Sequence, residues 1–115
     1  MSLKIYHNPR CSKSRAGLKA IEEAGKEVEI IKYLDNTPSF GELKEIVSMI
    51  GINAIDLVRT KEADWKENFK GKDLSEDEII QAMVDFPKLI ERPIVVKGDK
   101  AVLGRPVENI INLIS

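Results

Sequence analysis

The segment 3–34 constrains the fold most, because its pattern predicts two β-strands joined by a helix. Residues 3–7 (LKIYH) alternate in polarity and favour a strand. Over residues 12–24 apolar side chains recur three apart, which is typical of a helix, and residues 28–34 (VEIIKYL) predict a second strand. A strand, a helix and a strand in this order form a βαβ unit, whose strands are parallel with a right-handed crossover.

The middle of the chain is predicted to be helical. Two segments begin with the residues of a capping box, Ser39 with Glu42 and Ser75 with Glu78, and an apolar stripe follows each of them. Between them, Asn53 is suited to cap a short helix. A less regular stretch is predicted around residues 65–69.

The last third predicts a β-hairpin and a closing helix. Residues 94–96 and 101–103 are apolar and β-prone, and Gly98-Asp99 between them is a turn sequence. Pro106 suits the first position of a helix. The expected buried face of that helix consists of Val107, Ile110, Ile111 and Ile114.

The predicted order is β-α-β, a helical block, and β-β-α. Without the block, this is the layout of a thioredoxin-like fold in the α/β class. Element order alone does not determine topology, so an unrelated α/β domain is the alternative.

Composition narrows the class of protein. The chain has 115 residues, 43% hydrophobic and 32% charged, as expected for one compact domain. A formal net charge of −1 gives no basic field for nucleic acid, so no nucleic-acid partner is expected. No apolar run approaches the roughly 18 residues of a membrane span, and no secretion signal is evident, so we expect a cytoplasmic protein without a membrane partner. One cysteine and one histidine are too few for a metal site or an internal disulfide.

The lone cysteine, Cys11, stands between the predicted first strand and the predicted first helix. Such a cysteine can be a small buried hydrophobic residue. At a helix start, however, free N–H groups and the helix dipole favour an anion, so we expect a thiol pKa below the free value of about 8.5. Cations oppose the dipole at this end, and their clustering favours a bound negative group. The nearby cations and hydroxyl groups are Arg10, Ser12, Lys13, Ser14 and Arg15.

Ser14 stands where a dithiol motif would carry its second cysteine, so the motif is C-x-x-S. Two interpretations stay open: a first-turn helix residue with a backbone partner, or a hydrogen-bond donor to the thiolate. In both, the chain cannot form the internal disulfide of a dithiol oxidoreductase.

Several short segments, in a fixed order over nearly the whole chain, resemble the ArsC family of arsenate reductases, in the branch with a thioredoxin-like fold and glutaredoxin coupling. These segments are residues 5–15 (IYHNPRCSKSR), 33–34 (YL), 57–59 (LVR), 87–96 (PKLIERPIVV) and 103–106 (LGRP). The resemblance implies one ArsC-like domain over residues 1–115, with a helical insertion at about 39–88.

The resemblance also implies roles for individual residues. Cys11 is the expected nucleophile. Arg59, Arg92 and Arg105 are expected to bind the arsenic oxyanion, because guanidinium groups fit tetrahedral anions well. His7 matches a family histidine that helps to lower the cysteine pKa, and would assist if charged.

The rest of the loop is expected to support the site. Asn8 belongs to this loop, and Pro93 falls where thioredoxin folds carry a cis-proline. Arg10 and Lys13 depart from the small neutral residues of plasmid-type arsenate reductases, and the chain ends soon after its last helix. These features resemble the shorter chromosomal branch of the family, for which a cellular substrate other than arsenate is an alternative.

The implied reaction is the reduction of arsenate to arsenite, which takes two electrons. One cysteine cannot supply both, so glutathione is the expected co-substrate and glutaredoxin the expected partner, with no tightly bound cofactor. A monomer is expected. The alternatives are a general glutathione-dependent thiol reductase and a non-catalytic regulator of the related Spx type, which binds RNA polymerase. Ser14 argues against the C-x-x-C redox sensing of such regulators.

Overall fold

The computed structural model describes residues 2–115 and divides the chain into two compact units. The sheet unit contains the chain up to Asn36 and again from Arg92 onward, and the helical unit is Thr37–Glu91. The helical unit includes the segment predicted as an insertion. That the whole chain acts as one domain stays a prediction.

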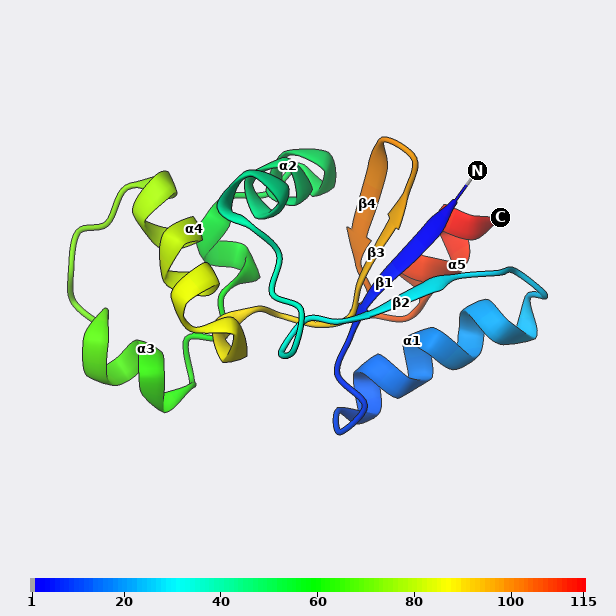
Figure 1. Cartoon of the computed structure of the whole chain (residues 1–115), viewed down its shortest axis with the longest axis horizontal. Coiled ribbons are helices and arrows are strands. Elements are labelled where there is room, and N and C mark those ends of the chain that lie inside the picture. Colours follow the sequence, from blue (N-terminus) through cyan, green and yellow to red (C-terminus); the bar gives the residue numbers. More distant parts are fainter. Residues whose placement is uncertain (1) are drawn as a thin grey trace. The chain divides into compact units, whose positions relative to one another are not determined.

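The sheet unit is a four-stranded mixed sheet with two helices. The strand order is β2-β1-β3-β4, with β1 and β2 parallel and the other two pairings antiparallel (Figure 1). The βαβ unit and the hairpin are therefore confirmed. The elements are β1 (Leu3–His7), α1 (Ser12–Glu23), β2 (Glu29–Lys32), β3 (Ile94–Lys97), β4 (Lys100–Leu103) and α5 (Glu108–Ile114).

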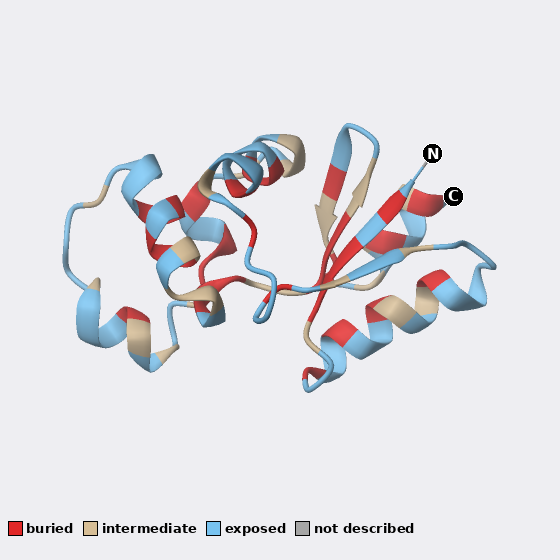
Figure 2. Ribbon diagram, in the orientation of Figure 1, coloured by how far each residue is buried: buried red, intermediate tan, exposed pale blue. Residues whose placement is uncertain are grey.

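One face of this sheet packs against α1 and α5 to form a hydrophobic core. On α1 the buried positions are Ser14, Gly17 and Ile21, which follow the helical period and appear as a stripe in Figure 2. Every second residue of β1 faces the same core, as a strand requires. The buried core residues are Leu3, Ile5, Ile21, Val95, Ile110 and Ile114.

The helical unit consists of short helices with local capping signals. Both predicted capping boxes are formed: Ser39 Oγ accepts the N–H of Glu42 at 3.2 Å, and Ser75 Oγ accepts that of Glu78 at 3.2 Å. Gly51 ends α2 in a left-handed conformation, φ 81°, which glycine adopts without strain. The elements are α2 (Phe40–Ile50), η1 (Ala54–Leu57), α3 (Ala63–Asn68), α4 (Glu76–Asp85) and η2 (Pro87–Leu89), where η denotes a 3₁₀ helix.

The segment predicted to be irregular is a helix, α3. Its Trp65 ring lies 5.3 Å from that of Phe69, which in turn meets Phe86 edge-on at 5.6 Å between ring centroids. This aromatic packing stabilises a helix of six residues that has no side-chain cap. One of the partners, Phe86, is distant in sequence, so the local sequence pattern did not reveal the helix.

The structure corrects three further predictions. Strand β2 ends at Lys32 rather than at residue 34, because a turn accepts N–H groups at the Lys32 carbonyl. The closing helix begins at Glu108, and Pro106 precedes it in a cis peptide with Arg105. Ile111 is 46% exposed rather than part of the buried face.

No helix within residues 2–115 is long and apolar enough to cross a lipid bilayer.

Candidate functional site

Cys11 occupies the N-cap position of α1, as the sequence predicted for a residue at the helix start. Its backbone is extended, with φ −95° and ψ 124°. A tight turn sets this position, because the Cys11 N–H donates to the Asn8 carbonyl at 3.0 Å and the Cys11 carbonyl accepts the Arg15 N–H at 3.0 Å. The side chain is buried, with 9% of the residue exposed.

Opposing effects act on the pKa of the Cys11 thiol, and the net result is a lowered pKa. Burial is the largest single effect and raises the pKa, because it disfavours a charge. The backbone N–H of Ser14, the Arg92 charge, the backbone N–H of Lys13 and a hydrogen bond from the Arg92 side chain together outweigh it. The α1 start and the Arg92 guanidinium therefore stabilise the thiolate.

The Ser14 hydroxyl binds the loop before the cysteine. Ser14 is 0% exposed, and its Oγ lies 2.7 Å from His7 Nδ1 and accepts the Asn8 N–H at 3.0 Å. This agrees with the interpretation of a first-turn helix residue with a backbone partner, which is the Asn8 N–H, and it adds a bond to the His7 imidazole that the sequence did not predict. Through Asn8, whose carbonyl accepts the Cys11 N–H, the hydroxyl helps to hold the turn.

His7 is buried at 6% exposure, and the structure favours its neutral ring. Burial has the largest effect and lowers the pKa of His7, and the charges of Lys32 and Arg15 lower it further. The charge of Glu22 raises this pKa, but its effect is smaller. The sequence suggested assistance from a charged His7. The geometry instead gives this residue a hydrogen bond to Ser14.

The basic residues of the loop have different surroundings. Arg15 donates from Nη1 to the Pro9 carbonyl at 3.0 Å, and the Arg10 N–H donates to Asn8 Oδ1 at 3.0 Å, so both stabilise the turn. The side chains of Arg10, Ser12 and Lys13 are exposed.

The register of the hairpin, continued beyond its last strand pair, would place Arg92 and Arg105 opposite each other. The ladder runs from Lys97 with Lys100 to Ile94 with Leu103, and the Gly104 N–H donates to the Pro93 carbonyl at 2.8 Å, which extends it by one pair. The next pair in this register is Arg92 with Arg105. Both arginines precede cis-prolines, so the cis isomer at Pro93 agrees with the resemblance.

Pro93 packs between two glycines. A Cβ atom on Gly17 would lie 2.9 Å from Pro93 Cγ, and one on Gly104 would lie 2.8 Å from the same atom. Both would also crowd Ile110 Cδ1, at 2.8 and 2.5 Å. Because Gly17 and Gly104 have no side chain, Pro93 and the preceding Arg92 can pack against α1. Sequence reasoning missed both glycines, since an isolated glycine in a helix or a loop does not by itself indicate a close packing contact.

Arg59 belongs to the helical unit. Its Nη1 donates to the Lys88 carbonyl at 3.3 Å, and its guanidinium lies 3.5 Å from Glu62 Oε2 and 3.7 Å from Glu91 Oε1. The structure thus brings Cys11 and Arg92 together, with Arg105 across the hairpin. The part of Arg59 in the site stays a prediction.

The model of the ArsC family matches residues 6–113, and this range includes every site residue described above. The chain belongs to the ArsC family. An arsenate reductase of Neisseria meningitidis is 46% identical over 110 residues, covering 94% of each chain. The uncharacterized protein YfgD of Escherichia coli is 47% identical to this ArsC protein over 114 residues, covering 97% of this chain and 96% of its own.

Solved structures agree. The arsenate reductase from Vibrio cholerae superimposes with a TM-score of 0.92 at 46% identity, covering 97% of each chain. The predicted α/β class and thioredoxin-like fold are confirmed for this ArsC protein by its four-stranded mixed sheet and by this likeness.

Proposed function

We propose that this ArsC protein is an arsenate reductase whose nucleophile is the Cys11 thiolate. The observation that carries the proposal is a buried thiol at a helix start, with its pKa lowered by Arg92 and by N–H groups of α1. Relatives at 42% to 46% identity are named arsenate reductases, which supports arsenate as the substrate. Sulfur attacks arsenic(V), and one arsenic oxygen leaves as water after protonation.

The arginines offset the negative charge of the oxyanion. Arg92 lies beside the sulfur and Arg105 opposite it on the hairpin, so arsenate bonded to Cys11 would meet guanidinium donors on that side. We assign Arg59 to the same role on the resemblance alone.

A second thiol must complete the reduction. Glutathione attacks the Cys11 sulfur, the S–As bond breaks, and its electron pair stays on arsenic, which becomes arsenic(III) and leaves as arsenite. A disulfide between Cys11 and glutathione remains. A second glutathione reduces it, with glutaredoxin as catalyst, so two thiols supply the two electrons. The Ser14 hydroxyl supplies neither a comparable nucleophile nor an electron pair.

The test measures arsenate-dependent oxidation of glutathione by wild type and by Cys11→Ser, with glutaredoxin present. We expect many turnovers by wild type and background rates for Cys11→Ser. An Arg92→Ala variant, which removes the guanidinium, should lose about 10²-fold in kcat, as is typical when an oxyanion donor is removed. Turnover by Cys11→Ser, or sustained turnover with thioredoxin as sole reductant, would contradict the scheme. Reduction of disulfides but not of arsenate would favour the general thiol reductase.

A further inference from the structure

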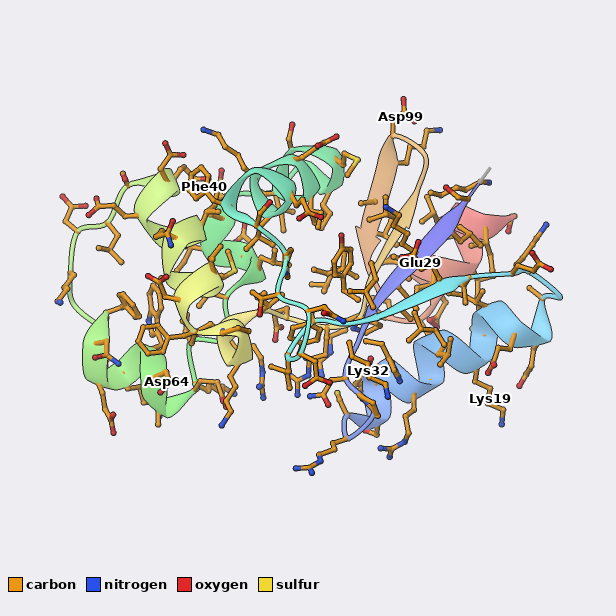
Figure 3. The ribbon with its side chains drawn as sticks, in the orientation of Figure 1. Lys19, Glu29, Lys32, Phe40, Asp64 and Asp99 are labelled. Carbon is orange, nitrogen blue, oxygen red and sulfur yellow. The ribbon has the colours of Figure 1, made fainter. Side chains whose placement is uncertain are left out.

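A cavity of about 290 Å³ lies in the sheet unit beside the loop that leads into α1. One wall is this loop, with Pro9 and Arg10. The other is the turn after β2, with Lys32, Leu34 and Asp35. Figure 3 labels Lys32, at the end of β2 next to the start of α1. The volume is close to the lower end of small-molecule sites, about 300 Å³.

Hydrogen bonds to backbone carbonyls hold both walls in place. The Lys32 carbonyl accepts the N–H groups of Asp35 at 3.0 Å and Asn36 at 2.9 Å. On the other wall, the Arg15 guanidinium holds the Pro9 carbonyl at 3.0 Å. The cavity is therefore preformed, while the side chains at its rim extend into solvent.

The rim of the cavity carries three charged side chains that form no ion pair in the described part of the chain. Arg10 and Lys32 are cations, Asp35 is an anion, and all three residues are exposed. Within residues 2–115, their charged groups form no hydrogen bond or ion pair with other side chains or with the backbone. Between them Leu34, 43% exposed, and Pro9 offer an apolar surface.

We propose that this cavity is the subsite for glutathione, the thiol that resolves the Cys11 adduct. Glutathione carries two carboxylates and one ammonium group, and the rim of the cavity carries two cations and one carboxylate. Arg10 lines the cavity and directly precedes Cys11 in the chain, so a tripeptide held there contacts the residue next to the nucleophile. The inference rests on the proposed function, because it names the site of its co-substrate.

Asp35 distinguishes glutathione from a simple oxyanion. The cations Arg10 and Lys32 attract arsenate, but the negative charge of Asp35 repels it. The ammonium group of glutathione is attracted to Asp35. The charge pattern therefore fits a zwitterionic thiol better than it fits the arsenic substrate.

The binding test uses S-methylglutathione, which keeps all three charges and cannot form a disulfide. Amide and His7 ring shifts of the wild-type protein, followed by NMR during titration, should locate the ligand at residues 7–10 and 32–35. Lys32→Gln should weaken binding about threefold, as expected for one exposed ion pair. Lys100→Gln, an exposed lysine on the opposite edge strand β4, is the matched control and should leave affinity unchanged.

The second arm blocks the ammonium group. Asp35→Asn should weaken binding of S-methylglutathione about threefold but should not weaken that of its N-acetyl derivative. Shifts centred on Arg92 and Arg105, an absence of binding, or equal loss of both ligands in Asp35→Asn would each overturn the subsite.

This test is independent of turnover, since neither arsenate nor a free thiol is present. Binding with the expected pattern, in a protein that fails to reduce arsenate, would contradict the proposed function and leave the glutathione subsite standing. Reduction of arsenate with glutathione, without binding in this cavity, would contradict the subsite alone.

Discussion

Helix starts of the helical unit are stabilised by interactions between neighbouring residues, whereas the sheet unit is stabilised by contacts between residues far apart in the sequence. In the helical unit, α2 and α4 begin at capping boxes whose two partners are three residues apart. In the sheet unit, the site depends on the packing of Pro93 against Gly17 and Gly104, which are distant in sequence from each other. This difference shows that helix starts can be predicted from neighbouring residues. The site, in contrast, depends on residues that come into contact only after folding. The same substitution should therefore act differently in the two units.

Glycine to alanine gives the largest contrast. In Gly104→Ala the new methyl group would meet Pro93 and Ile110 at 2.8 and 2.5 Å, so we expect a loss of about 2 kcal/mol in the free energy of unfolding. In Gly41→Ala, within α2, nothing lies within 4 Å, and we expect a gain of about 0.5 kcal/mol. Urea denaturation of both variants checks this. If both variants changed the free energy of unfolding in the same direction, the contrast between the two units would be wrong.

Serine to alanine gives a smaller contrast. Ser14→Ala removes the partner of His7 Nδ1 and of the Asn8 N–H in a buried site, so we expect a loss of about 2 kcal/mol in stability. Ser39→Ala removes one exposed N-cap, with an expected loss of about 1 kcal/mol. Thermal unfolding of the two variants in one buffer gives the difference. A larger loss for Ser39→Ala would show that the capping box contributes more than the buried hydroxyl.

The smallest effects are changes of pKa at two helix starts. Arg92→Gln should raise the pKa of the Cys11 thiol, since it removes a cation and a hydrogen bond from the thiolate. In the helical unit, the Ser75 backbone and hydroxyl lower the pKa of Glu78, so Ser75→Ala should raise that pKa by removing the hydroxyl alone. The rate of alkylation against pH measures the thiol, and carboxyl ¹³C shifts measure Glu78. An unchanged thiol pKa in Arg92→Gln would remove Arg92 from the site.

The lowered pKa of the Cys11 thiol also makes the stability of the protein depend on pH. Because the folded protein releases the Cys11 proton more readily than the unfolded chain does, the stabilisation by ionised Cys11 is complete above the unfolded pKa of about 8.5. It declines as the pH falls toward the lowered pKa of the folded state. The difference in stability between wild type and Cys11→Ala should therefore widen with pH in that window.

Much of the fold could be predicted from the sequence because its signals are local. The capping boxes at Ser39 and Ser75 and the turn at Gly98 are examples, since each needs only neighbouring residues. The helix around Trp65 could not be predicted, because its aromatic packing extends through Phe69 to Phe86, which is distant in sequence. Exposure of Ile111 also depends on how α5 packs rather than on periodicity.

The same distinction applies to the candidate site. Cys11 at a helix start could be predicted from the strand and helix around it. The bond between Ser14 and His7 could not, because it joins a helix to a strand end, and neither residue type specifies that partner. Lys32 carried no signal either, since a lysine at a strand end is usually only a solvated charge.

The register of the β3–β4 hairpin has a consequence for how this protein can change over generations. Side chains alternate between the two faces of a strand, so one residue added at the Gly98-Asp99 turn, without a compensating bulge, would shift the pairing of the ladder. Arg92 would then no longer stand opposite Arg105. The length of this turn would thus be constrained during evolution, because it determines whether the two arginines beyond the strand ends lie opposite each other.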